Sequence, residues 1–165
     1  MRNIVSILCL PALMSSAALA STATANLTPS ATITNNCTVT GNPIAFGAYN
    51  PLTGAEVTQT ATISVTCTNG MTAPPVTLGQ GLHAATGSTD AAPLRQLNAS
   101  VGHDLTYNLY SENTYTTVWE NVTGVASPTP NGSAQNMTVY GKIDAGQTTA
   151  SVGTYTDTVV VTVTF

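Results

Sequence analysis

Polar and apolar residues alternate with a period of two along much of this chain, which is the pattern of half-buried β-strands. Residues 59–67, QTATISVTC, place four apolar side chains on one face, namely Ala61, Ile63, Val65 and Cys67. Short β-branched or aromatic runs between Gly, Pro and Asn residues predict further strands at Cys37–Thr40, Ile44–Phe46, Pro75–Leu78, Leu105–Tyr110 and Met137–Ile143. Loops are predicted at 48–56, 79–92 and 124–133. Because no segment has helical spacing, we expect an all-β fold, either a two-sheet sandwich or a barrel.

The two ends of the chain carry the same alternation. Residues 157–165, DTVVVTVTF, form a strand with one apolar face: Val159, Val161, Val163 and Phe165. This is either an ordinary core strand or an end that something else holds. Residues 21–37 place apolar side chains on odd positions: Ala23, Ala25, Leu27, Pro29, Ala31 and Ile33. This extended segment is a frayed terminus, the first strand of the fold, or a detachable strand that pairs with another molecule.

Residues 1–20 have the features of an export signal peptide. Arg2 gives a positive start, Ile4–Met14 is apolar, and Ala18-Leu19-Ala20 is a small-x-small cleavage site. A second such triplet, Ala23-Thr24-Ala25, leaves the exact cleavage site open. No later segment has the roughly 18 consecutive apolar residues of a membrane-spanning helix. We therefore expect an exported protein without membrane insertion.

Two cysteines, Cys37 and Cys67, follow the signal peptide. In an oxidising compartment such a pair is most simply one disulfide. The alternative is a metal site, which the sequence disfavours because it has no Cys-x-x-Cys, and neither His83 nor His103 is near a cysteine. We expect no metal.

The charge content limits the functions that the chain can have. Its 165 residues include 3 Lys plus Arg and 7 Asp plus Glu, a net charge of −4. So few cations cannot neutralise a run of phosphates, which excludes nucleic acid as a partner. His103-Asp104 is the one place where acid/base groups adjoin, but neighbours in an extended chain point to opposite sides. We expect no enzyme, no catalytic residue and no cofactor, and we expect Arg95 and Lys142 to be surface or sheet-edge partners of carboxylates.

Several motifs occur in a defined order along the chain. The first half contains Cys37-Thr38-Val39, Phe46-Gly47 and Ile63-Ser64-Val65-Thr66-Cys67. The second half contains Val139-Tyr140-Gly141-Lys142-Ile143 and Gly153-Thr154-Tyr155-Thr156-Asp157-Thr158, which leads into the final strand. In these motifs the chain resembles the spore coat protein U family, whose members include shaft subunits of archaic chaperone-usher pili.

The resemblance implies an incomplete immunoglobulin-like β-sandwich at 34–165, completed by donor-strand complementation. It implies a structural subunit of a surface pilus that polymerises by donor-strand exchange and serves adhesion and biofilm formation. The implied partners are a periplasmic chaperone, an outer-membrane usher and neighbouring subunits. The donor strand would lie in the extension 21–33, with Ala23, Ala25, Leu27, Ala31 and Ile33 pointing inward. The acceptor groove, which also contacts the chaperone, would be bordered by Val159, Val161, Val163 and Phe165.

Two other functions remain open. A non-polymerising coat or secreted matrix protein would keep its own amino-terminal strand, and a tip adhesin would bind a receptor. The adhesin is disfavoured because tip subunits of such pili normally add a binding domain. Pro29 departs from a regular donor strand because it has no N–H for the ladder. The donor therefore ends before Pro29, or Pro29 marks a bend towards the body of the subunit.

Overall fold

The computed structural model describes residues 19–99 and 104–165, and the chain divides into two units at Thr32. Within the first unit, residues 19–32 are exposed and form no helix or strand. Most of the predicted signal peptide, and His103, lie outside the described residues. The second unit begins at Ile33 and contains all the strands described below.

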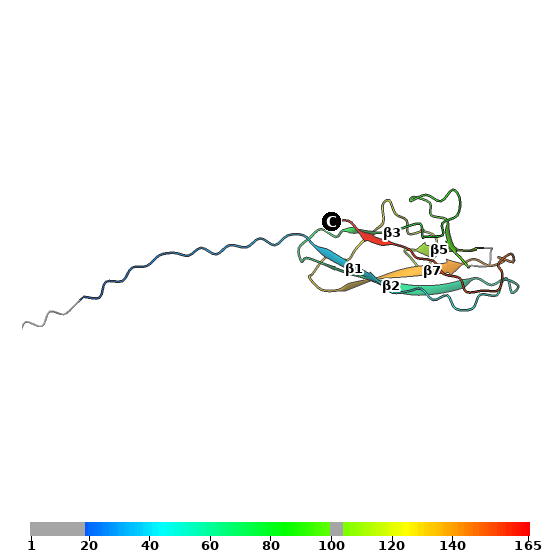
Figure 1. The fold of residues 1–165 in the computed structure, drawn as a ribbon, viewed down its shortest axis with the longest axis horizontal. Coiled ribbons are helices and arrows are strands. Elements are labelled where there is room, and N and C mark those ends of the chain that lie inside the picture. Colours follow the sequence, from blue (N-terminus) through cyan, green and yellow to red (C-terminus); the bar gives the residue numbers. More distant parts are fainter. Residues whose placement is uncertain (1–18, 100–103) are drawn as a thin grey trace, which may run out of the picture. The chain divides into compact units, whose positions relative to one another are not determined.

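Eight strands in the described residues form two sheets (Figure 1). They are β1 (Cys37–Gly41), β2 (Val57–Cys67), β3 (Pro75–Leu78), β4 (Arg95–Leu97), β5 (Leu105–Tyr110), β6 (Val125–Ala126), β7 (Gln135–Ile143) and β8 (Val161–Val163). The first sheet has the order β1-β2-β7-β5-β4 and the second has the order β6-β3-β8. Every pairing is antiparallel. The expectation of an all-β fold is confirmed.

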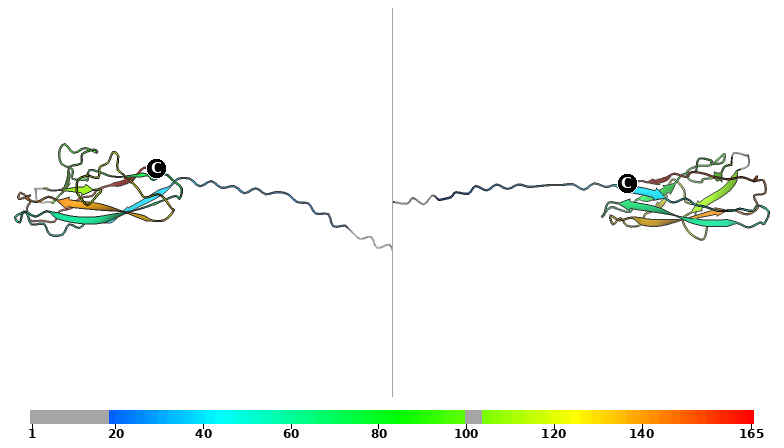
Figure 2. Two further views of the ribbon diagram at one scale, coloured as in Figure 1. Left: turned by 180° about the vertical axis from the view of Figure 1, so that it is seen from behind. Right: turned by 60° about the horizontal axis from the view of Figure 1, so that its bottom comes forward.

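The core lies between the two sheets (Figures 1 and 2). In β2 the predicted apolar face is buried at Ile63, Val65 and Cys67 and half-buried at Ala61. Opposite it in β7, Met137 and Val139 are buried as well. The second sheet contributes Val76 and Leu78 from β3. No helix in the described part of the chain is long and apolar enough to span a bilayer.

The structure corrects three details of the strand prediction. A strand at Ile44–Phe46 is wrong: the pairing with β2 ends where Asn42 N–H donates to Thr62 O (2.9 Å). The alternation there reflects side chains packed against the core, without a backbone partner. The short strands β4 and β6 have no clear sequence pattern, and β6 interrupts a predicted loop, because their pairing partners rather than their own residues define them.

Gly141 in β7 allows the segment after β1 to pack on the sheet. A Cβ built on Gly141 would lie 2.8 Å from Phe46 Cζ and 3.3 Å from Ile44 Cδ1. Phe46 in turn packs edge-on against Tyr107, with ring centroids 5.9 Å apart. Any side chain at residue 141 would therefore displace Phe46 from the core.

We predict that Gly141→Ala destabilises the protein by about 1–3 kcal/mol, the usual cost of overpacking a core. The matched control is Gly41→Ala in β1, where the nearest atom to a new Cβ is Val161 Cγ2 at 3.7 Å, an ordinary contact. Urea unfolding monitored by Trp119 fluorescence measures both variants. Equal stability of the two variants would contradict the packing argument.

Candidate functional site: the open edge of the second sheet

Strand β8 ends the second sheet, and among the described residues it pairs with β3 alone. Figure 1 shows β8, in red, beside β3. The backbone hydrogen bonds between the segment that contains β8 and its neighbours on the β3 side extend well beyond the three residues of β8. Thr164 N–H donates to Pro75 O, Gly79 N–H donates to Val160 O, and Leu82 N–H donates to Thr158 O. Further along, Thr156 and Asn98 exchange two backbone hydrogen bonds.

In the segment around β8, every residue that makes one of these hydrogen bonds has an even number: 156, 158, 160 and 164. Successive residues of a strand direct their backbone groups to alternate sides, so the N–H and C=O groups of residues 155, 157, 159, 161 and 163 point to the open side. The same odd residues also turn their side chains towards the core, where all five are half-buried. The even residues 156–164 are exposed. This edge segment, residues 155–163, therefore offers both backbone groups and an apolar face to an additional strand.

Three of the four predicted acceptor residues share this arrangement. Val159, Val161 and Val163 pack against the core with their backbone groups facing outward. Phe165 follows the same parity but is 58% exposed. The sequence prediction missed Tyr155 and Asp157, although the alternation of odd positions continues through them and could have identified both.

The first sheet supplies the other rim of the opening through β1. Its even residues face β2, because Asn36 O accepts from Thr68 N–H and Asn42 N–H donates to Thr62 O. A disulfide joins Cys37 to Cys67, the residue directly opposite in β2, with the Cα atoms 4.1 Å apart. This covalent bond attaches the start of β1 to the sheet. Strands β1 and β8, the two sides of the opening, come closest where Gly41 of β1 lies near Val161 of β8.

Beyond this close approach the opening widens into a cleft of about 730 Å³. Its walls are the segment 43–51, which follows β1, and the segment 150–157, which precedes β8. Most of the large side chains that line it are apolar or aromatic: Ile44, Phe46, Leu97, Leu105, Ile143 and Tyr155. The cleft is therefore a wide continuation of the open edge, suited to an apolar side chain.

Asp157, the polar residue of the edge, anchors it to the rest of the domain. Its carboxylate accepts hydrogen bonds from Tyr107 Oη (2.7 Å), Leu82 N (2.9 Å) and His83 N (3.2 Å). Burial, and then the hydrogen bond to Asp157, raise the pKa of Tyr107 well above its usual value. The Tyr107 hydroxyl therefore stays protonated and donates to the carboxylate.

Arg95 sits directly opposite Tyr107 in the sheet and connects the two layers. Arg95 lies on the edge strand β4 but is only 1% exposed, and its hydrogen bonds go to carbonyls. The expectation of a surface or sheet-edge partner for a carboxylate is therefore wrong. The Arg95 guanidinium donates to Gly79 O, Leu78 O and Trp119 O at 2.8–2.9 Å. Burial lowers the pKa of Arg95 to about 10, which leaves it charged at neutral pH. Lys142, by contrast, pairs with Asp144 at 2.9 Å on the outer face, as expected.

We predict that Arg95→Met destabilises the protein by about 3 kcal/mol, because each buried carbonyl left without a donor costs about 1–3 kcal/mol. Lys142→Met removes the other cation, whose carboxylate partners are exposed, and should cost less than about 1 kcal/mol. Urea unfolding distinguishes the two variants. A comparable loss in both would mean that the three carbonyl contacts contribute little.

The predicted donor residues are all exposed. Leu27 is 90% exposed and Ile33 is 85% exposed, and the alanines at 23, 25 and 31 are exposed as well. No residue from 21 to 36 is charged. The segment therefore presents an alternating apolar face to solvent.

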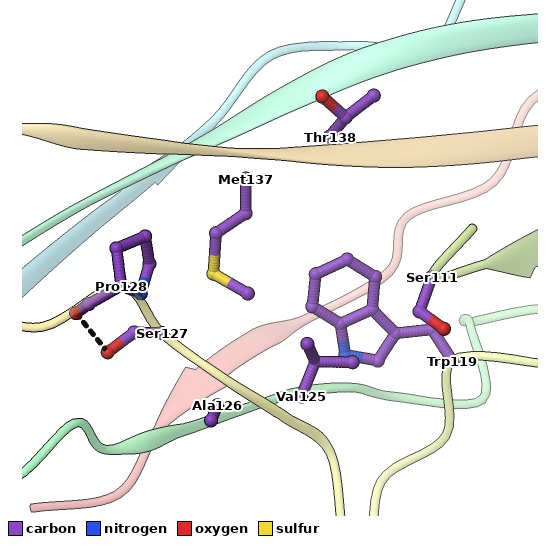
Figure 3. A pocket seen from close by; sticks show the side chains of 8 residues that line it. All are labelled: Ser111, Trp119, Val125, Ala126, Ser127, Pro128, Met137 and Thr138. Atoms are coloured by element: carbon purple, nitrogen blue, oxygen red, sulfur yellow. Dashed lines mark hydrogen bonds between the residues drawn. The ribbon is translucent and has the colours of Figure 1, made fainter. Parts of the chain in front are cut away.

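A second pocket, of about 310 Å³, lies between β6 and β7 (Figure 3). Trp119, Met137, Val125 and Pro128 line it, and Trp119 Nε1 donates to Val76 O (2.8 Å). None of its lining residues has an acidic or basic side chain. In the described part of the chain, no three His, Cys, Asp or Glu residues form a group that could hold a metal ion. Neither observation points to acid/base or metal chemistry in this pocket.

Comparison with solved structures defines the fold class as an immunoglobulin-like β-sandwich. The chain is similar to a chain in the CsuC–CsuE chaperone-tip adhesion subunit pre-assembly complex from archaic chaperone-usher Csu pili of Acinetobacter baumannii. The TM-score is 0.55 at 21% identity over 81% of this chain. The match spans only 40% of that solved chain.

Sequence comparison identifies the family. The family model of the Spore Coat Protein U domain matches residues 22–162. Protein U of Myxococcus xanthus is 42% identical over 127 residues, which are 73% of this chain and 70% of that protein. The chain belongs to the spore coat protein U domain family, and the resemblance found in the sequence is confirmed.

Proposed function

We propose that the protein is a structural subunit of a chaperone-usher surface pilus and that it polymerises by donor-strand exchange. The observation that carries this proposal is the open edge segment, residues 155–163, whose odd residues offer backbone groups and a half-buried apolar face at once. Strand addition to a free sheet edge needs both: backbone hydrogen bonds give affinity and alternate side chains give register. The role is structural and requires no catalytic residue and no cofactor.

The donor in this proposal is the extension 21–33 of a second copy or of a related subunit. From Ala23 to Ile33 its odd residues are apolar and its even residues are polar, which matches the one-sided apolar face of the acceptor. Burying a Leu or Ile side chain contributes about 1.5–3 kcal/mol. Because donor and acceptor are different surfaces, each subunit binds one neighbour and is bound by another, and the contact builds an open filament.

An unpaired edge of this kind is also a template for uncontrolled association. The proposal therefore includes a periplasmic chaperone that occupies the edge during export and an outer-membrane usher where the donor replaces it. The family membership and the similarity to a chain from a chaperone–subunit complex support these partners. The filament would then stand on the cell surface and serve adhesion and biofilm formation.

A non-polymerising coat protein is the second candidate, and the name of the family favours it. In that case residues 21–33 would complete the sandwich of their own chain. The two functions differ in what an isolated subunit does.

We predict that the mature chain, produced without a chaperone, polymerises or is unstable, because its edge has no partner. Light scattering and size-exclusion chromatography measure this, with the same chain co-produced with a pilus chaperone as the control. A stable monomer that is unaffected by chaperone would support the coat protein instead.

We predict that Leu27→Asp strongly reduces assembly, because an isolated charge would be buried at the contact. Thr28→Asp is the matched control: it adds the same charge one residue away, on the opposite face of the strand. Filament yield after shearing from the cell surface compares the two variants. Equal assembly of both would remove Leu27 from the donor face.

A further inference from the structure

On the basis of the proposed function, we propose a specific register for the donor strand. Residues 21–27 of one subunit run antiparallel to the edge segment of the next. Leu27 lies opposite Tyr155, Ala25 opposite Asp157, Ala23 opposite Val159, and Ser21 opposite Val161. Pro29 then lies just beyond the paired residues, at the start of the linker to β1.

The parity of both strands restricts the possible registers. In an antiparallel pair, directly opposite residues point their side chains to the same face. The core-facing residues of the edge segment are odd, and so are the apolar residues of the extension. Each apolar donor residue must therefore lie opposite one of residues 155, 157, 159, 161 and 163. Because the backbone groups of these residues also face the donor, every such pair is a hydrogen-bonded pair.

Pro29 removes most of the remaining registers. It is an odd residue, and without an N–H it would leave the C=O group of whichever edge residue it opposed without a donor. Pro29 must therefore lie outside the edge segment. If it lay beyond Val163, only Ala31 and Ile33 would remain as apolar donor residues before Cys37, which is already in β1. If it lies before Tyr155, opposite Gly153, then Leu27 is the first paired residue.

The width of the opening selects the same register independently. It is narrow at Val161, where Gly41 lies close, and it widens into the cleft of about 730 Å³ beside Tyr155. In the proposed register the small side chains of Ser21 and Ala23 lie at the narrow end. Leu27, the largest apolar side chain of the donor, lies at the wide end. A parallel strand with Leu27 opposite Tyr155 would instead place Ile33, another large side chain, opposite Val161 at the narrow end.

Cysteine pairs between subunits test this register. A single acceptor variant, Val159→Cys, is combined in the full-length chain with Ala23→Cys, Ala25→Cys or Leu27→Cys. Directly opposite residues of a hydrogen-bonded pair have Cα atoms about 5.5 Å apart, within the range of a disulfide. Filaments are collected from cells that carry the chaperone and usher, and the subunits are separated on a non-reducing gel after denaturation. We expect a ladder of covalent multimers for the pair 23–159. The pairs 25–159 and 27–159 should give no ladder.

Pro29→Ala provides a second, independent readout. Since Pro29 lies outside the paired residues, the variant should still form filaments. Without the proline, however, other registers become possible, and we expect cross-links to appear for 25–159 and 27–159. If Pro29→Ala leaves the cross-linking pattern unchanged, the proline does not set the register.

The outcomes separate this inference from the proposed function. Filaments in which 27–159 is the main cross-link, or in which no pair cross-links, overturn the register but leave strand exchange intact. Filaments that form equally well without residues 21–33 overturn strand exchange itself. Ala25→Cys paired with Val161→Cys reports a parallel strand that keeps Ala23 opposite Val159, and a ladder from that pair would also overturn the register.

Discussion

One constraint governs this structure: the residues that complete the core at the edge of the second sheet also carry backbone groups without a partner in the described chain. In a β-strand, side-chain direction and hydrogen-bond direction alternate together. Because the even residues 156–164 bond towards β3, the backbone groups of the odd residues point to the open side. The burial pattern shows that the same odd residues turn their side chains towards the core. The edge thus combines free backbone groups with a half-buried face, which is what the addition of a strand requires.

The surrounding contacts hold this edge in a fixed shape. Arg95 connects the two layers through three buried carbonyls, and Asp157 joins the edge itself to Tyr107 and to the loop after β3. On the opposite rim the Cys37–Cys67 disulfide attaches β1 to its neighbour. A binding edge held by a rigid frame loses little conformational entropy when a partner binds. Two charged groups, Arg95 and Asp157, thus help to position the edge.

The extension and the edge are complementary in chemistry as well as in pattern. Residues 21–33 have no charged side chain, and their polar face consists of hydroxyl and amide groups. Such a face is compatible with solvent before binding and with the exposed outer surface of a sheet afterwards. The family model of the Spore Coat Protein U domain matches residues 22–162 and so covers most of the extension and of the edge.

The sequence by itself determined the fold class, most strands and the two alternating ends, because a period of two is a local property that each strand carries in its own residues. It also selected Val159, Val161 and Val163. Only the tertiary structure decided that Arg95 is buried, that Ile44 and Phe46 line a cleft instead of forming a strand, and that Asp157 belongs to the edge. These features depend on which distant segments meet. A local pattern records how a residue alternates with its neighbours, but not which carbonyl or ring it will contact across the sandwich.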